Sequence, residues 1–117
     1  VAVRHPRKDD AYLTFFPLRD AAISTSGDYE RFYEKSGARR SHIIDPRSGM
    51  PVERMQSVSV IAPRGVDSDA LSTAIFVLGE DRGIALVESL PGIEALVVTG
   101  DGRIVMSQGW PEKTVVY

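Results

Sequence analysis

The chain has 117 residues, of which 43% are hydrophobic and 26% are charged, and its formal net charge is −2. These proportions are ordinary for a globular protein, and the small charge gives no electrostatic basis for binding nucleic acid or an anionic membrane. The absence of cysteine excludes disulfides and thiolate metal sites, and no apolar run approaches the ~20 residues of a membrane span. We expect one domain or part of one.

Short strands are predicted to dominate the first half of the chain. Stretches rich in β-branched and aromatic residues predict strands; they lie at residues 1–3, 11–18, 21–27 and 57–62. Pro17 marks an edge or an end of the second stretch, because proline cannot donate to a ladder. Residues 29–44 alternate well enough for a hairpin with Ser36-Gly37 as its turn. The first strand begins abruptly, so we expect the chain to be cut from a longer polypeptide.

Helical periodicity replaces the strand pattern between residues 67 and 90. Apolar residues recur there at roughly every third or fourth position; they are Leu71, Ile75, Leu78, Ile84 and Val87. Asp67 or Ser68 can cap a first helix, and Gly79 can end it. A second helix is predicted from residue 80 to residue 90, where Pro91-Gly92 stops it.

A last hairpin is predicted over residues 93–110, with Gly100-Asp101-Gly102 as its turn. Strands therefore dominate, and a helical pair is inserted between them. This order predicts an α+β fold with a mainly antiparallel sheet. Trp110, at the end of the hairpin, is predicted to pack in the core, and His5, in a predicted surface turn, carries little functional weight.

Asp69 and Thr73 are four residues apart at the predicted start of the first helix, so both lie on one helix face. A carboxylate and a hydroxyl offer the hard oxygen ligands that Mg²⁺ prefers, and Mg²⁺ usually completes its shell with water and substrate phosphate. The alternative is structural. The helix dipole alone favours an aspartate in a first turn, and a threonine can simply occupy the helix.

A second concentration of reactive groups is the stretch SHIIDPRSGMPV, residues 41–52. His42 can exchange a proton near neutral pH, or it can be a half-buried histidine satisfied by hydrogen bonds. Asp45 precedes a proline and can simply open a turn, whereas Arg47 can pair with a phosphate or remain solvated. The backbone N–H groups at Ser26-Gly27 can approach a ligand, although Ser-Gly is also a common turn.

Four motifs, taken in order, resemble the ApbE family, the FAD:protein FMN transferases. They are TSGDYERF at 25–32, HIIDPRSGMPV at 42–52, SVSVIAP at 57–63 and DSDALSTAIFVLG at 67–79. Family members read approximately TSGDYERFF, HIIDPRTGRP, SVTVIAP and ADALATALFVLG in the same order and spacing. Ser48 replaces a threonine of this pattern, and Ser68 and Ser72 replace alanines. None of these changes removes a group that the chemistry needs.

The resemblance implies a T-fold-like arrangement of sheet and helices and a reaction that Mg²⁺ assists. FMN is transferred from FAD to a serine or threonine hydroxyl of a target protein, and AMP is released. By position, Asp69 and Thr73 match the family's metal ligands, and His42 matches the histidine proposed as catalytic base. The motifs around the flavin and its phosphates contain Ser26, Gly27, Asp45 and Arg47. The resemblance also implies a periplasmic protein or a membrane-anchored lipoprotein.

Members of the family are much longer than this chain, so residues 1–117 resemble a C-terminal portion that lacks the N-terminal half. We therefore expect the chain to be inactive alone and to self-associate through its edge strands or through exchanged segments. Two other functions stay open. One is a Mg²⁺-dependent FAD pyrophosphatase, in which water replaces the protein hydroxyl. The other is a flavin-binding module without catalysis.

Overall fold

The computed structural model describes residues 1–8, 11–27, 32–35, 38–41 and 55–113. Within these residues the elements follow one another in the order β1 (Ala2–Arg4), β2 (Tyr12–Phe15), β3 (Ala22–Gly27), β4 (Phe32–Lys35), β5 (Ala38–Ser41), β6 (Met55–Ala62), α1 (Gly65–Leu78), α2 (Glu80–Glu88), β7 (Glu94–Thr99) and β8 (Ile104–Met106). Each described strand pair is antiparallel. The predicted α+β class with an inserted helical pair is therefore confirmed.

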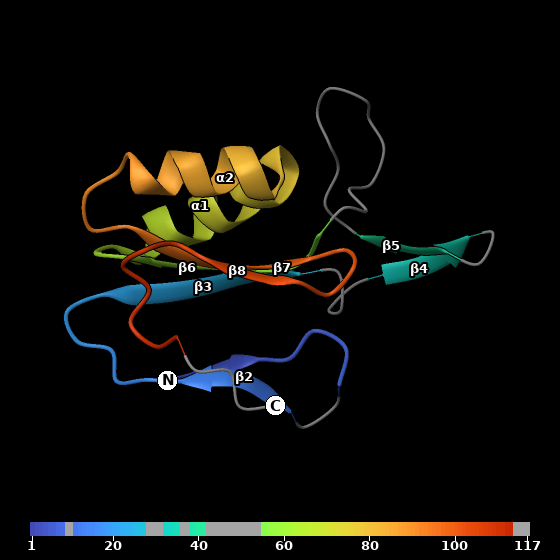
Figure 1. The fold of residues 1–117 in the computed structure, drawn as a ribbon, viewed down its shortest axis with the longest axis horizontal. Helices are drawn as coiled ribbons and strands as arrows, with labels where there is room; N and C mark the ends of the chain where they lie inside the picture. The colour runs from blue at the N-terminus through green and yellow to red at the C-terminus, as the bar shows by residue number, and fades with distance from the viewer. Residues whose placement is uncertain (9–10, 28–31, 36–37, 42–54, 114–117) are drawn as a thin grey trace.

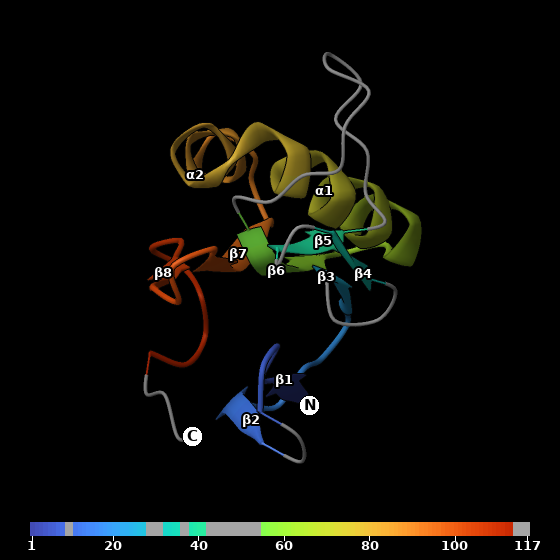
Figure 2. The same ribbon diagram turned by 90° about the vertical axis from the view of Figure 1, so that its right-hand side faces the viewer.

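A four-stranded sheet in the order β3-β6-β7-β8 forms the middle layer of the molecule (Figure 1). Both helices cover one face of this sheet, and the β1–β2 hairpin lies on the other side, as the rotated view also shows (Figure 2). β4 and β5 pair with each other in a separate two-stranded ladder beyond one end of the sheet. The predicted hairpin between residues 29 and 44 is thus present over its described strands.

β6 is buried along its whole length because both faces of the sheet are covered. Val58, Val60 and Ala62 belong to the apolar cluster under the helices. Ile61 belongs to the cluster on the opposite face. This alternation follows from the pleat of a strand, in which successive side chains point to opposite faces. The helix-facing positions are apolar, whereas the opposite face carries the buried hydroxyls of Ser57 and Ser59 beside Ile61.

The face opposite the helices is closed by residues at the start and the end of the described chain. Leu13 and Phe16 from the hairpin segment pack there with Trp110, which is only 2% exposed. The ring of Phe16 meets Trp110 edge-on, with 5.4 Å between the ring centroids and 78° between their planes. Such a pair contributes beyond its buried area. The prediction that Trp110 is a packing residue is confirmed.

α1 begins earlier than the sequence predicts. The helix starts at Gly65 after Arg64, and no side chain caps it, so the predicted caps Asp67 and Ser68 are wrong. The Oγ of Ser68 lies one turn inside the helix and donates to the backbone carbonyl of Gly65 at 2.9 Å. Gly79 ends the helix as predicted, with a φ of 92° that favours glycine.

α2 ends at Glu88, slightly before its predicted limit at residue 90. Neither described helix combines the length and the hydropathy that a bilayer span requires. The predicted last hairpin is present as β7 and β8, and its turn is closed by the N–H of Gly102, which donates to the carbonyl of Thr99 at 3.0 Å.

Candidate functional site

The edge strand β3 brings Ser26 against helix α1. Ser26 lies opposite Val58 in the β3–β6 ladder and shares its helix-facing side of the sheet. Its Oγ is 2.8 Å from the Oγ of Ser72 and 3.1 Å from the Oγ1 of Thr73. The structure therefore joins Ser26, from the predicted flavin-binding group, to Thr73, from the predicted metal-binding pair, although the two are far apart in sequence.

A second hydroxyl pair lies next to the first along the same two elements. The Oγ atoms of Ser24 and Ser68 are 2.7 Å apart. Two residues along a strand span ~6.6–6.8 Å and one turn of helix spans about 5.4 Å. Because these two distances are similar, two successive side chains on the strand can each contact one of two side chains that lie one turn apart on the helix. We call this set of contacts the hydroxyl seam; it consists of Ser24, Ser26, Ser68, Ser72 and Thr73.

Asp69 lies on the solvent side of this seam. Both Asp69 and Thr73 are exposed, and their spacing places them on the same helix face. Because α1 begins at Gly65, Asp69 falls after the first turn, whose acidic residue is Asp67. The dipole effect fades beyond that turn. The structural explanation for Asp69 is accordingly weaker than the sequence indicated.

The donor chemistry of Asp69 and Thr73 fits a partly hydrated Mg²⁺. Within the described ranges, no group of three or more histidine, cysteine, aspartate or glutamate side chains is placed to hold a metal. Two hard oxygen ligands are nevertheless enough for an ion that keeps several waters and shares substrate phosphates. Two protein ligands suit Mg²⁺ better than they suit a cation that takes all its ligands from the protein.

The other predicted site residues divide into two groups. Gly27 ends β3, is buried, and lies opposite Ser57 in the ladder with β6. Its place directly after Ser26 puts the strand end beside the hydroxyl seam. His42, Asp45 and Arg47 lie outside the described residues.

His5 serves the turn that follows β1. Its Nδ1 accepts hydrogen bonds from the backbone N–H groups of Arg7 at 3.0 Å and Lys8 at 3.1 Å. Desolvation, with the nearby charges of Lys8 and Arg7, lowers the pKa of His5. These contacts agree with the prediction of a turn residue.

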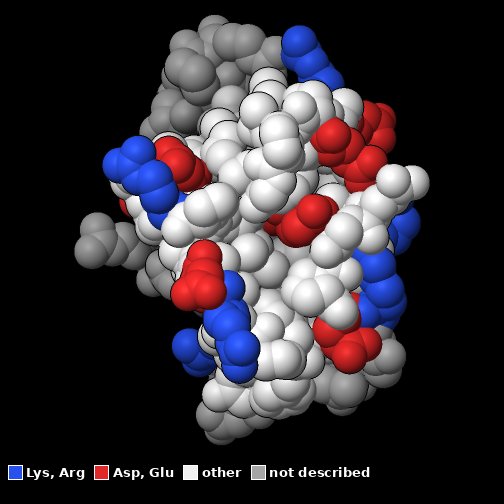
Figure 3. All heavy atoms as spheres, turned by 90° about the vertical axis from the view of Figure 1, so that its left-hand side faces the viewer, with Lys and Arg blue, Asp and Glu red and all other residues white. Residues whose placement is uncertain are grey.

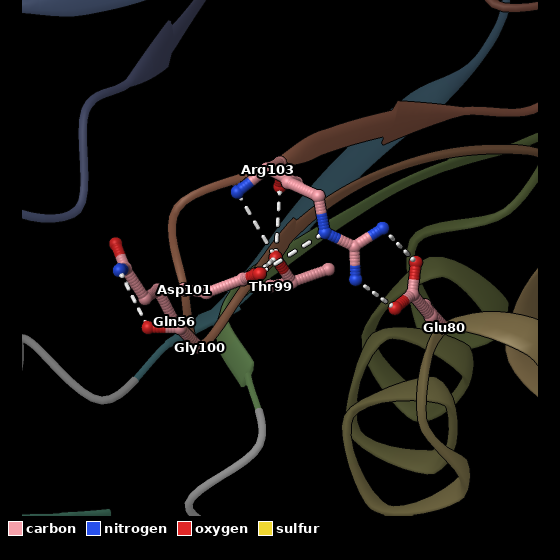
Figure 4. A network of polar contacts seen from close by, with 6 residues as sticks. All are labelled: Gln56, Glu80, Thr99, Gly100, Asp101 and Arg103. Atoms are coloured by element: carbon pink, nitrogen blue, oxygen red, sulfur yellow. Dashed lines mark hydrogen bonds and ion pairs between the residues drawn. The ribbon is translucent and has the colours of Figure 1, made fainter.

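The turn between β7 and β8 carries a polar network that the sequence did not predict (Figure 4). Arg103 bonds to Glu80 at the start of α2 through Nη2 at 2.6 Å and to Asp101 through Nε at 3.1 Å. Hydrogen bonds from Thr99 and then from Arg103 lower the pKa of the Asp101 carboxyl. The network ties the hairpin turn to α2. No sequence signal links Glu80 to Arg103, because their approach depends on how the helix packs.

The hydroxyl partners Ser24, Ser68 and Ser72 were also missed as contacts. A signal was available: serines recur at the strand period on β3 and at the helical period on α1, so each element carries one small polar stripe. What the sequence lacked was the register between the two elements.

The described surface shows no bias toward one sign of charge on the face in Figure 3, where acidic and basic side chains are interspersed. A cavity of about 250 Å³ lies at the junction of the two helices and is lined by Met55, Leu78, Gly79, Glu80, Asp81 and Arg82. None of the predicted site residues in the described part lines it. Asp69 and Thr73 instead face open solvent beside β3.

Comparison with known proteins identifies relatives over most of the chain. Residues 1–97 match the model of the ApbE family. The chain is 48% identical over 93 residues to the FAD:protein FMN transferase of Treponema pallidum (strain Nichols), covering 79% of this chain and 26% of that protein. It is 38% identical over 104 residues to the FAD:protein FMN transferase of Escherichia coli (strain K12), covering 87% and 29% respectively.

Solved structures similar to this chain also belong to ApbE proteins. The ApbE protein of Thermotoga maritima superposes with a TM-score of 0.79 and 38% identity, covering 93% of this chain and 36% of that one. The flavinyl transferase ApbE of Pseudomonas stutzeri, in its apo form, gives a TM-score of 0.72 and 37% identity, covering 92% and 34%. The chain therefore spans about a quarter to a third of the length of these relatives.

Proposed function

Because this chain belongs to the ApbE family, we propose that the protein containing it is an FAD:protein FMN transferase that moves FMN from FAD onto a hydroxyl of an acceptor protein. The observation that carries the proposal is the seam contact of 3.1 Å between Ser26 and Thr73, which joins two of the family's motifs on one surface. The activities for which the relatives are named support the same function.

The proposed reaction replaces a phosphoanhydride bond of FAD by a phosphate ester bond to the acceptor. The hydroxyl oxygen of an acceptor serine or threonine forms a bond to the phosphorus of the FMN half of FAD. The bond from that phosphorus to the bridging oxygen breaks, and AMP leaves with the electron pair. The hydroxyl proton passes to a base. No oxidant or reductant is needed, so catalysis depends on positioning and charge stabilisation.

Asp69 and Thr73 are the proposed ligands for Mg²⁺. Their exposed oxygens lie one helical turn apart and can reach an ion that also contacts the diphosphate. When bound, Mg²⁺ would neutralise part of the negative charge of the FAD diphosphate. The role of the chain is to hold these oxygens in place.

His42 is the proposed base for the acceptor hydroxyl, as its motif position implies. Ser26 and Gly27, at the end of β3, are proposed to lie against the flavin diphosphate together with Asp45 and Arg47. Because this chain spans only part of its relatives, we propose that FAD is enclosed by further polypeptide as well as by these residues.

The metal assignment is tested in the complete protein by Asp69→Ala. Transfer that depends on Mg²⁺ should be abolished while the fold is retained, because the proposed carboxylate ligand of this chain is lost. Asp67→Ala is the matched control, since Asp67 is an acidic residue on the same helix. Unchanged Mg²⁺ dependence in Asp69→Ala contradicts the assignment.

The same assay decides the reaction type through its products. FMN attached to protein supports the transferase. Free FMN with AMP in the presence of acceptor indicates a pyrophosphatase, and unchanged FAD indicates a binding module. Either of the last two results overturns the proposed function.

A further inference from the structure

We propose that Ser72 and Ser26 are positioning residues that form a one-way hydrogen-bond relay, which points the proton of Thr73 inward and leaves its oxygen lone pairs facing the metal. The inference rests on the proposed function, because it concerns how Thr73 serves as a ligand. It assigns roles to Ser72 and Ser26 that follow from the direction of three hydrogen bonds.

The direction of the relay is set by a backbone carbonyl. The Oγ of Ser72 lies 2.9 Å from the carbonyl oxygen of Asp69 and donates to it, since a carbonyl can only accept. A serine hydroxyl has a single proton. Ser72 therefore has no proton left for Ser26 and must accept in the 2.8 Å contact between their Oγ atoms.

The same count fixes the next link. Ser26 gives its proton to Ser72, so it accepts in the 3.1 Å contact with Thr73. Thr73 is then the donor, and its proton points at Ser26. The sequence of donors is Thr73 to Ser26 to Ser72 to the carbonyl of Asp69.

The relay has a chemical consequence for the exposed hydroxyl of Thr73. A cation is bound by oxygen lone pairs, and a hydroxyl whose proton is held elsewhere presents lone pairs to solvent. Hydrogen bonds in a chain polarise one another, which makes the terminal oxygen a better electron donor. The relay also begins at one proposed ligand and ends on the backbone of the other, Asp69, so it couples the positions of both.

The neighbouring link of the seam supplies an internal control. Ser68 donates to the carbonyl of Gly65 at 2.9 Å and accepts from Ser24 at 2.7 Å by the same count. Ser68 and Ser72 are both fully buried on α1, one turn apart. The contacts of Ser68 do not reach Thr73. Ser68→Ala therefore removes an equivalent hydroxyl without touching the relay.

The test measures Mn²⁺ binding to the complete protein saturated with FAD, without acceptor, from the loss of the free Mn²⁺ signal in electron paramagnetic resonance. Ser72→Ala frees the proton of Ser26 to compete for the oxygen of Thr73. We expect Mn²⁺ affinity to fall roughly threefold to tenfold, the range for one hydrogen bond. Ser68→Ala should change it by less than about twofold.

A double-mutant cycle separates positioning from general damage to the helix. In a Thr73→Val background the relay has no terminal hydroxyl, so Ser72→Ala should have no further effect on Mn²⁺ binding. Ser26→Ala removes the hydroxyl of β3 that joins Thr73 to Ser72 and should also weaken Mn²⁺ binding. This variant tests the relay even if Ser72→Ala folds poorly. Equal effects of Ser72→Ala and Ser68→Ala, or an undiminished effect without the Thr73 hydroxyl, overturn the relay.

Asp69→Asn distinguishes failure of the relay from failure of the metal site. Loss of Mn²⁺ binding in Asp69→Asn with no specific effect of Ser72→Ala leaves the proposed function standing and removes the relay alone. Unchanged Mn²⁺ binding in Asp69→Asn removes both.

Discussion

At the scale of single residues, His42 is the group assigned to move a proton, and His42→Ala isolates that step. Loss of a general base typically slows a reaction ~10²–10⁴-fold. We expect transfer by the complete protein to slow by that order, with FAD affinity little changed, because the base acts on the acceptor hydroxyl. Single-turnover kinetics with a separate FAD titration measure both quantities. Transfer at nearly the wild-type rate would make His42 structural.

Asp101 gives a prediction about pH. Hydrogen bonds from Thr99 and Arg103 lower the pKa of its carboxyl in the folded state. The stability that these bonds contribute is therefore present above the unfolded pKa of about 3.9 and is lost as the pH falls through the lower folded value. Asp101→Asn should reduce the melting temperature near neutral pH.

The difference in melting temperature between Asp101→Asn and wild type should disappear in acid, where the wild-type carboxyl is protonated. Thermal melts of the two proteins between pH 7 and about pH 2 measure it. A deficit that is the same at both ends of this range would show that the charge of Asp101 is not involved.

Individual site residues differ in how far the sequence could predict their contacts. The pairing of Asp69 with Thr73 follows from helical spacing alone. The contact of Thr73 with Ser26 does not, because it depends on how α1 packs over the sheet. The cap assigned to Ser68 was wrong for a related reason: its hydroxyl bonds within the helix and to Ser24.

At the scale of elements, the two helices meet at Gly83. A Cβ at this position would lie 2.5 Å from Cγ2 of Ile75, which is fully buried on α1. Overpacking in Gly83→Ala should lower the free energy of unfolding by about 1–3 kcal/mol. The higher helix propensity of alanine offsets ~1 kcal/mol of this loss. Denaturant unfolding of the complete protein measures the balance.

A truncation of the partner side chain tests the cause. In an Ile75→Ala background the clash is removed, so Gly83→Ala should cost less there than in wild type. An equal cost in both backgrounds would point to a different origin.

Most element types were predictable, and their limits less so. β3, β6 and the last hairpin follow from β-branched runs and glycine turns, and α1 and α2 follow from the change of period. The start of α1 was misplaced because no side chain caps it, so the usual signal is missing. Ser57 and Ser59 alternate with Val58 and Val60, but the burial of the two serines could not be predicted from sequence, because it depends on what packs against their face of β6.

At the scale of the whole molecule, the hairpin side of the sheet exposes aromatic surface. Tyr12 and Phe15 are 43% and 53% exposed, and their rings lie 5.4 Å apart. Among the described residues, the buried Oγ1 of Thr14 and Nε1 of Trp110 have no hydrogen-bond partner. The exposed rings of Tyr12 and Phe15 favour a neighbour on this side.

We predict that the 117-residue chain alone self-associates and does not transfer FMN. Burying this apolar surface against a second copy is worth ~25 cal/mol per Å². Light scattering at micromolar concentration, with FAD titration, measures association and binding. Phe15→Ser should reduce association, whereas Val66→Ser should not, because Val66 is an exposed apolar residue on α1, across the sheet. A monomer that binds FAD tightly with Mg²⁺ would contradict the prediction.

The central place of β6 has a consequence for how the molecule opens. Its backbone is paired on both sides, to β3 and to β7, and its side chains are buried on both faces. Its amide hydrogens can exchange with deuterium only when the sheet itself comes apart, so their rates should report global unfolding. The β1–β2 hairpin has one ladder and an exposed outer face, and its amides should exchange through a smaller, separate opening. The proposed ligands are carried by α1, which packs on both β3 and β6. The proposed ligands Asp69 and Thr73 are therefore expected on the slowly exchanging part of the molecule.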